Sequence, residues 1–103
     1  MSVNNEGGRV VNGGIRLDGK VVLVTGTSPN IGGVLAAGFG AAGAHVACLD
    51  LKADHANGCA ERVIADGGSA MGLVADVTDP AAMADAVNQV LDRWGRIDVL
   101  VNN

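Results

Sequence analysis

Four short apolar segments alternate with three helical patterns, and this alternation constrains the fold more than any other feature of the chain. The apolar segments are too short for helices and rich in β-branched residues, so they predict buried strands. Apolar strands that alternate with single helices imply right-handed βαβ units, an α/β fold and a parallel sheet with helices on both faces. The predicted order is strand 21–24, helix 30–42, strand 45–49, helix 53–65, strand 70–75, helix 80–94 and strand 97–101.

Residues typical of helix ends support these boundaries. In the third helical segment Asp79 is a good N-cap, Pro80 suits the first helical position, and apolar residues follow at helical spacing up to Gly95. The first helical segment contains Gly38 and Gly40, each of which costs about 1 kcal/mol of helix propensity relative to alanine. We expect these small residues to let the helix approach the sheet closely.

The remaining composition limits the domain organisation and the partners. Residues 1–17 are rich in glycine and asparagine without any helical or strand period, so we predict a flexible N-terminal tail followed by one domain at 18–103. Seven basic and 11 acidic residues leave a net charge of -4, which argues against binding to nucleic acid or to an anionic membrane surface.

The longest run without charged residues is not expected to span a membrane. Residues 21–49 carry no charged side chain, but six glycines and a polar turn break the run into two apolar pieces. Residues 1–14 hold no apolar segment typical of a secretory signal. We therefore expect a cytoplasmic protein.

Four potential metal ligands lie close together in the sequence, namely His45, Cys48, His55 and Cys59. His45 and Cys48 are three apart in a predicted strand and therefore point to opposite faces. His55 and Cys59 could share a helix face, but two ligands do not complete a structural zinc site. We expect no metal site, and two cysteines in a chain of this kind do not indicate a disulfide framework.

A glycine-rich turn lies between the first predicted strand and the first predicted helix. Such a turn leaves backbone N–H groups at the positive end of a helix, where a phosphate can bind. No Gly-Lys-Ser/Thr follows, so it is not a nucleoside-triphosphate loop. A methyl-donor site fits less well because a closely spaced Gly-x-Gly is missing, although spacing alone leaves it open. The turn consists of Gly26, Thr27, Ser28, Pro29, Asn30, Ile31 and Gly32.

Two acidic residues follow the next strands along the chain. Asp50 ends the second predicted strand, at a distance from Gly26 where a carboxylate can accept hydrogen bonds from both hydroxyls of an adenosine ribose. Asp76 ends the third predicted strand at the same edge of the sheet. Ligands of open α/β sheets bind outside the carboxyl ends of the strands. Together with the turn, these acids predict a dinucleotide site.

Four motifs follow one another along the chain. They are Leu-Asp-Gly-Lys-Val-Val-Leu-Val-Thr-Gly at 17–26, Thr-Gly-x-x-x-x-Ile-Gly at 25–32, Asp-Val-Thr-Asp at 76–79 and Ile-Asp-Val-Leu-Val-Asn-Asn at 97–103. Together they resemble the N-terminal portion of a classical short-chain dehydrogenase/reductase, from about Leu17 to Asn103. The resemblance implies a partial Rossmann fold, doubly wound, with a four-stranded parallel sheet of order 3-2-1-4.

The family's turn usually reads Thr-Gly-x-x-x-Gly-x-Gly, and Asn30 here replaces the middle glycine. After glycine, asparagine is the residue that best tolerates the left-handed conformation, so we expect the turn to keep its shape.

By the same resemblance, residues from Gly26 to Ile31 would wrap the pyrophosphate and the adenosine ribose. Asp50 would hold the ribose and Leu51 would lie beside the adenine. The resemblance further implies adenine contacts from Asp76 and Val77, and a cofactor contact from Asn103.

The resemblance also bears on which dinucleotide binds. NADP-preferring members often carry a basic residue where this sequence has Pro29 or Leu51, and Asp50 would repel a 2′-phosphate. Lys52 is basic but lies one residue later. We expect NAD rather than NADP.

The catalytic residues implied by the resemblance are missing from this sequence. The family transfers a hydride between the nicotinamide and an alcohol or ketone by a Tyr-x-x-x-Lys pair with a serine upstream. The 103 residues contain no tyrosine, and both lysines lie in the cofactor half. We therefore predict no catalytic residue here, and expect a truncated NAD-binding domain that is inactive alone.

Three further points stay open at this stage. The chain could be a stand-alone, non-catalytic NAD-binding module or half of a split enzyme. It could also bind a different adenosine ligand. The family is usually homo-oligomeric, but the helices that make those contacts are not among these residues.

Overall fold

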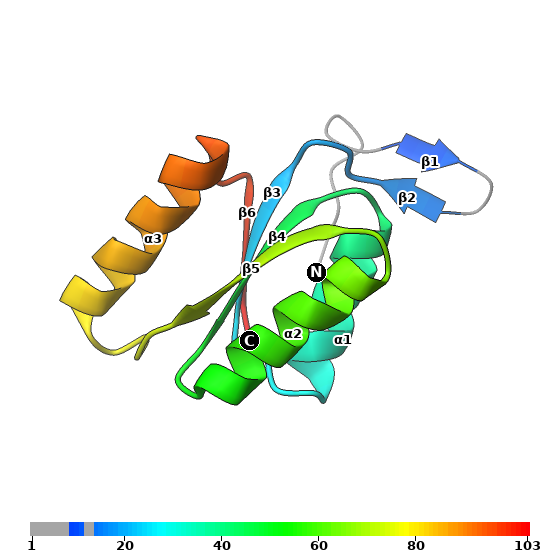
Figure 1. The fold of residues 1–103 in the computed structure, drawn as a ribbon. Coiled ribbons are helices and arrows are strands. Elements are labelled where there is room, and N and C mark those ends of the chain that lie inside the picture. The colour runs from blue at the N-terminus through cyan, green and yellow to red at the C-terminus, as the bar shows by residue number, and fades with distance from the viewer. Residues whose placement is uncertain (1–8, 12–13) are drawn as a thin grey trace.

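The computed structural model describes residues 9–11 and 14–103, and its centre is a four-stranded parallel sheet (Figure 1). The strand order β5-β4-β3-β6 confirms the predicted order 3-2-1-4, with β3 and β4 in the middle. The strands are β3 (Val21–Thr25), β4 (His45–Asp50), β5 (Ser69–Val74) and β6 (Val99–Asn102).

The helices cover both faces of this sheet, as predicted. α1 (Ile31–Ala41) and α2 (Ala53–Ala65) lie on one face, and α3 (Pro80–Trp94) lies on the other (Figure 1). Two hydrophobic cores result, and β3 serves both. Val22 and Val24 pack into the core of α1 and α2, whereas Val21 and Leu23 pack into the core of α3. This two-sided burial explains why the strand is apolar throughout rather than alternating.

The predicted ends of α3 are confirmed. The side chain of Asp79 accepts hydrogen bonds from the N–H groups of Ala81 and Ala82 at 3.0 and 3.3 Å, and Pro80 occupies the first turn. Gly95 ends the helix with a positive φ of 75°, a conformation that glycine adopts without steric cost. No helix in the described part of the chain is both long and apolar enough to cross a membrane.

The predicted flexible tail stays a prediction, because residues 1–8 and 12–13 lie outside the described residues. The described part of that segment contains β1 (Arg9–Val11) and β2 (Gly14–Arg16), which pair antiparallel and which we did not predict. Leu17 is buried in the core, and its N–H donates to the carbonyl oxygen of Ala42 at 2.7 Å. This contact connects the start of the sheet domain to the end of α1.

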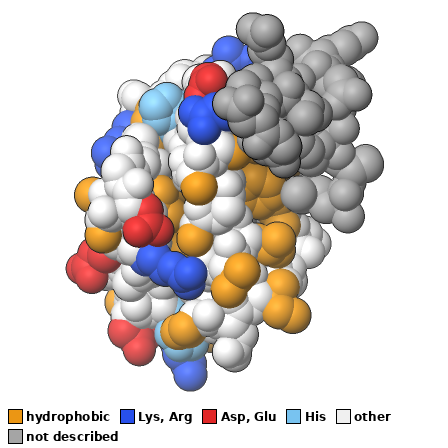
Figure 2. Space-filling view, turned by 90° about the vertical axis from the view of Figure 1, so that its right-hand side faces the viewer, with side chains coloured by type: hydrophobic (Ala, Val, Ile, Leu, Met, Phe, Trp, Pro, Cys, Tyr) orange, Lys and Arg blue, Asp and Glu red, His pale blue; other side chains and the backbone are white. Residues whose placement is uncertain are grey.

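Several large apolar side chains remain exposed. Leu100 on the edge strand β6 is 62% exposed, and Ile31 and Val34 on α1 are 69% and 56% exposed. Figure 2 shows one face of the molecule, on which hydrophobic side chains lie among polar and charged ones. Within the described residues β6 pairs only with β3, so its other edge is open. An open edge of this kind offers unpaired backbone groups to another strand.

Gly38 and Gly40 of α1 have different surroundings, and neither allows the approach to the sheet that we expected. A Cβ atom at Gly40 would lie 2.6 Å from Cγ1 of Val63, which belongs to α2. Gly40 therefore permits close packing between two helices rather than between a helix and the sheet. A Cβ atom at Gly38 would meet nothing within 4 Å.

Asp98 joins the start of β6 to the start of β3. Its Oδ2 accepts a hydrogen bond from the N–H of Val21 at 2.8 Å, and its Oδ1 accepts one from the guanidinium of Arg96 at 2.6 Å. Partial burial raises the pKa of Asp98, but the hydrogen bonds from Arg96 and Val21, together with the positive charges of Arg96 and Lys20, outweigh burial and bring the pKa below its ordinary value of 3.8. The ionised carboxylate thus helps to hold β6 on the sheet.

Substitution of Gly38 and of Gly40 by alanine should have opposite effects. Gly38→Ala should raise the free energy of unfolding by about 0.5–1 kcal/mol, because alanine favours the helix and the site is open. Gly40→Ala should lower it by about 1–2 kcal/mol, because Val63 is a stiff β-branched side chain that cannot move aside freely. Urea denaturation of the two variants, each compared with the unmodified chain, measures both effects. Equal stabilisation by both substitutions would contradict the assigned helix contact.

The contribution of Asp98 should depend on pH. A carboxylate whose pKa is lowered on folding stabilises the fold fully above its ordinary pKa, and loses this effect as the pH falls through the folded value. Asp98→Asn should therefore lower the free energy of unfolding by about 1 kcal/mol near neutral pH. The loss should become progressively smaller as the pH falls. Denaturation as a function of pH tests this, with Asp85→Asn, an exposed acid of α3, as the control. If the loss of unfolding free energy in Asp98→Asn stayed constant down to acid pH, the charge of Asp98 would not be the source of its stabilising effect.

Candidate functional site

A cleft of about 230 Å³ lies at the carboxyl edge of the sheet, where the ends of all four strands meet. Six of the residues predicted to bind a cofactor line it, each at a strand end or just beyond one. These are Gly26, Asp50, Leu51, Asp76, Val77 and Asn103. The remaining predicted residues, from Thr27 to Gly32, form the turn into α1 and are not among the cleft-lining residues in the described part of the chain.

The turn after β3 depends on two glycines. Gly26 has a φ of +71°, and its N–H donates to the carbonyl oxygen of Leu49 at 2.9 Å. A Cβ atom at Gly32, in the first turn of α1, would collide with the carbonyl oxygen of Gly26. The helix therefore begins directly against the turn, and only glycine allows that approach.

Asn30 does not adopt the left-handed conformation whose tolerance was our reason for expecting the turn to keep its shape. Asn30 has a φ of -78° and precedes the first residue of α1 as its N-cap, although its side chain makes no capping hydrogen bond. A residue that leads into a right-handed helix takes a negative φ, which any residue can adopt. Gly26 supplies the positive φ that the turn needs, so the turn forms without a glycine at position 30.

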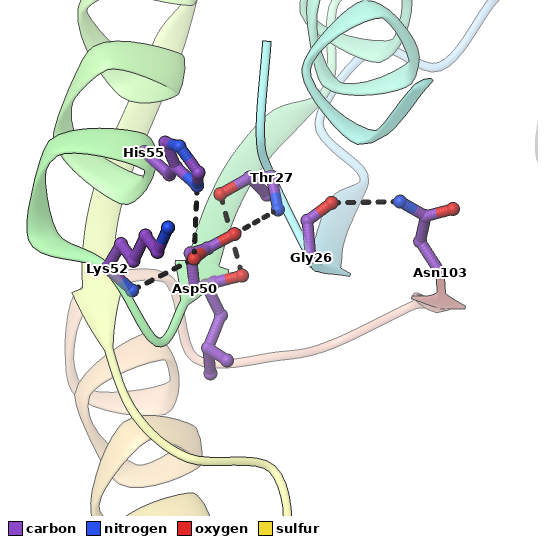
Figure 3. A network of polar contacts seen from close by, with 7 residues as sticks. Gly26, Thr27, Asp50, Lys52, His55 and Asn103 are labelled. Carbon is purple, nitrogen blue, oxygen red and sulfur yellow. Dashed lines mark hydrogen bonds and ion pairs between the residues drawn. The ribbon is translucent and has the colours of Figure 1, made fainter. Parts of the chain in front are cut away.

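The carboxylate of Asp50 connects three segments at the end of β4 (Figure 3). Its Oδ2 accepts a hydrogen bond from the N–H of Thr27 at 2.8 Å, and its Oδ1 accepts one from the N–H of Lys52 at 2.9 Å. Nδ1 of His55, in the first turns of α2, lies 3.5 Å from Oδ1. The side chain of Asp50 is only 11% exposed. We predicted a ligand contact for Asp50 but not this structural role.

Thr27 contributes its backbone rather than its side chain. The residue is 1% exposed, and its hydroxyl lies 3.5 Å from the carbonyl oxygen of Leu49, to which it donates. Pro29, Asn30 and Ile31 are exposed at the tip of the turn. The side chain of Thr27 is therefore not available to a ligand, whereas its exposed neighbours are.

Asn103 closes the other side of the turn. Its side-chain Nδ2 donates to the carbonyl oxygen of Gly26 at 2.9 Å (Figure 3). Its backbone N–H donates to the hydroxyl of Thr25 at 3.3 Å. A Cβ atom at Gly26 would lie 3.1 Å from the carbonyl oxygen of Asn103. The end of β6 and the turn after β3 are thus packed together.

The second acid of this edge, Asp76, is ionised and exposed. The hydroxyl and the N–H of Thr78 both donate to Oδ1 of Asp76, at 2.6 and 2.8 Å, and they lower the pKa of that carboxyl below its ordinary value. Two exposed apolar side chains accompany it in the cleft lining, Leu51 at 67% and Val77 at 55% exposure. Apolar side chains beside a strand-end acid suit a flat ring with polar edges.

The four potential metal ligands do not come together. His45 stacks on Trp94 of α3 with ring centroids 5.3 Å apart, whereas Cys48 packs with Cys59 in the opposite core. The prediction that His45 and Cys48 point to opposite faces is confirmed. Within the residues that the structure describes, no group of three potential ligands is arranged to hold a metal ion.

Comparison with known proteins identifies a matching family and similar relatives. The sequence matches the short chain dehydrogenase family over residues 20–103. It is 42% identical over 88 residues to the D-threitol dehydrogenase of Mycolicibacterium smegmatis, an alignment that covers 85% of this chain and 34% of the relative. The chain thus spans about a third of the length of this curated relative.

Solved structures of the same family share the fold. A hydroxysteroid dehydrogenase from Escherichia coli superposes with a TM-score of 0.83 at 35% identity, covering 85% of this chain and 37% of that one. A 7α-hydroxysteroid dehydrogenase complexed with NADH and 7-oxo glycochenodeoxycholic acid superposes with a TM-score of 0.82 at 35% identity, covering 85% and 34%. With the family matched over most of the sequence and the fold shared with its solved members, the chain belongs to the short-chain dehydrogenase family.

Proposed function

We propose that this chain is the N-terminal, dinucleotide-binding part of an NAD-dependent short-chain dehydrogenase/reductase. The whole enzyme would transfer a hydride between the nicotinamide and an alcohol or ketone. The observation that carries the proposal is the Asp50 carboxylate, which lies against the glycine turn at the mouth of the cleft. Family membership supports the class of cofactor, and a structural relative is complexed with NADH.

The turn and the start of α1 suit a pyrophosphate. The first N–H groups of a helix have no partner within it and carry a partial positive charge, so they attract phosphate oxygens. The first turn of α1 contains no acidic residue that would neutralise this end of the helix. Gly32 and Gly33 lack the side chains that would fill the space against the turn.

Asp50 retains acceptor capacity for a ribose. An ionised carboxylate has about four acceptor positions, and the N–H groups of Thr27 and Lys52 occupy one on each oxygen. The two oxygens can therefore still accept hydrogen bonds from two adjacent hydroxyls. The backbone hydrogen bonds hold the carboxylate in place before the ligand arrives, which reduces the entropic cost of binding.

The adenine would lie between apolar and polar groups of the cleft. Leu51 and Val77 would present exposed apolar surface to the faces of the ring, and polar groups of and around Asp76 would meet its polar edge. Asn103 would contact the cofactor from the end of β6, and its hydrogen bond to Gly26 in the turn supports this role. NAD is favoured over NADP because the Asp50 carboxylate would face a 2′-phosphate at close range.

The proton donor for the substrate would come from residues outside this sequence. The 103 residues contain no tyrosine, so a Tyr-x-x-x-Lys pair cannot form among them. The chain alone would bind cofactor without turning over substrate. A cytoplasmic location and homo-oligomeric assembly of the whole enzyme are parts of the same proposal.

The chain should bind NADH, and should bind NADPH about tenfold more weakly, a difference of about 1.4 kcal/mol. Asp50→Asn should weaken NADH binding by about tenfold and reduce the preference for NADH over NADPH, because the repelling charge is removed. Isothermal titration calorimetry measures both. The fluorescence of Trp94 would report poorly on NADH binding, because Trp94 stacks on His45 at the start of β4, at the end of the strand opposite Asp50.

Asp54→Asn is the matched control, because it removes an exposed acid from the first turn of α2 without touching the cleft lining. It should leave both affinities unchanged. NADH affinity weaker than millimolar, or binding of S-adenosylmethionine in place of NADH, would refute the proposed cofactor.

The coding sequence after the Asn103 codon should continue in frame with Ala-Gly and, further on, with a Tyr-x-x-x-Lys pair. A protein that includes this continuation should reduce NAD with an alcohol substrate, whereas the 103 residues alone should not. Sequencing of the transcript and a dehydrogenase assay on both proteins check this. A stop codon at that point, with NADH binding retained, would instead favour the non-catalytic module or the half of a split enzyme.

A further inference from the structure

The two cysteines of the chain meet in the core between β4 and α2. Cys48 is the fourth residue of β4 and Cys59 lies in the middle of α2. Their sulfur atoms are 3.0 Å apart and share a hydrogen bond, and both thiols are free. Cys48 is fully buried, whereas Cys59 keeps 6% of its surface exposed. The proposed cofactor binding does not use either residue.

Backbone packing brings these sulfurs together. Cys48 pairs in register with Gly72 of β5. A Cβ atom at Gly72 would lie 2.5 Å from Oδ1 of Asn57 and 3.1 Å from the carbonyl oxygen of Ala56. α2 therefore lies directly on the sheet at Gly72, and Cys59 is one turn beyond Ala56. The absence of a side chain at Gly72 is what allows α2 to place Cys59 against Cys48.

The two thiols differ in reactivity. The hydrogen bond between the two sulfurs lowers the pKa of Cys59, and the positive charge of Arg62 acts in the same direction, whereas burial and the charge of Asp50 oppose it. The same sulfur contact, together with burial, raises the pKa of Cys48. The thiolate is the reactive form of cysteine. Cys59, which is also the more exposed of the two, is therefore the nucleophile and Cys48 the neighbouring thiol that can react with its product.

We propose that Cys48 and Cys59 form a redox-responsive dithiol, which a small hydroperoxide converts into a disulfide between β4 and α2. The Cys59 thiolate attacks the peroxide oxygen, the O–O bond breaks, and hydroxide leaves and takes up a proton as water, so that Cys59 becomes a sulfenic acid. The Cys48 sulfur then attacks the Cys59 sulfur, the S–O bond breaks, and a second water carries away the Cys48 proton. The two thiols lose two electrons and two protons in all, and one hydrogen peroxide becomes two waters.

The disulfide requires little movement of the fold. A disulfide bond is about 2.0 Å long, so the two sulfurs must approach by about 1 Å. The bond would close a loop that contains Asp50, Lys52 and His55, the residues whose polar contacts surround the end of β4. Reducing agents would restore the dithiol, which is the resting form under reducing conditions.

The test treats the reduced chain with hydrogen peroxide, blocks the remaining thiols with N-ethylmaleimide and digests the protein with trypsin without reduction. Trypsin cleaves after Lys52, which separates Cys48 in peptide 21–52 from Cys59 in peptide 53–62. The expected product is these two peptides joined, with the mass of two hydrogen atoms lost, and their separation by dithiothreitol. Labelling of both cysteines, a sulfinic acid on Cys59 with Cys48 still labelled, or linkage between two chains would overturn the proposal.

Two comparisons show whether the fold causes the reaction. Linkage should be about tenfold faster in buffer than in concentrated guanidinium, because folding holds the reacting groups together. Gly72→Ala should slow linkage by lifting α2 from the sheet, whereas Gly58→Ala, a change at an open position of α2, should not. Equal rates in buffer and guanidinium would overturn the proposal even if Gly72→Ala does not fold.

Discussion

The parallel pairing of β3 with β4 on one side and β6 on the other determines the rest of the structure. The register places Thr25, the last residue of β3, beside Leu49 and Asn102. Three strands therefore end at the same level, and the residues that follow them meet there. The cleft exists because Gly26, Asp50 and Asn103, which are distant in sequence, each come directly after or at one of these ends.

Hydrogen bonds at the two ends of β3 stabilise this pairing in different ways. At the start of the strand, Asp98 accepts from the N–H of Val21 and holds β6 in place. At the other end, Asp50 accepts from Thr27, and Asn103 donates to Gly26. The second pair of contacts serves two purposes, since Asp50, Asn103 and Gly26 stabilise the turn and also line the cleft. The site is thus formed by the interactions that terminate the strands, before any ligand is present.

Much of the fold followed from local patterns in the sequence. The bounds of α2 were predicted from the local sequence pattern. The capping of α3 was predicted because it depends on residues at the helix ends, namely Asp79, Pro80 and Gly95. The strand order came from the family resemblance and was confirmed. The placement of Asp50, Asp76 and Asn103 at one edge was also predictable, because the carboxyl ends of parallel strands must meet.

The features that we missed depend on contacts between distant segments. Gly40 packs against Val63 of the next helix, and nothing in the α1 segment distinguishes it from Gly38. The tolerance of asparagine for a positive φ is not needed at Asn30, because this residue leads into the helix with a negative φ. The contact between Cys48 and Cys59 depends on Gly72 in a third segment. Such three-body arrangements leave no periodic signal in the sequence.

The position of β6 in the sheet also has a consequence for the order of folding. Asp98 and Val21, which meet at the start of the two strands, are separated by 77 residues, whereas Thr27 and Asp50 are separated by 23. Closing a longer loop costs more chain entropy and slows the formation of the contact. The pairing of β3 with β4 is therefore expected to form faster than the pairing of β3 with β6. The side of the described cleft that Asn103 forms would consequently be completed after the side that Asp50 forms.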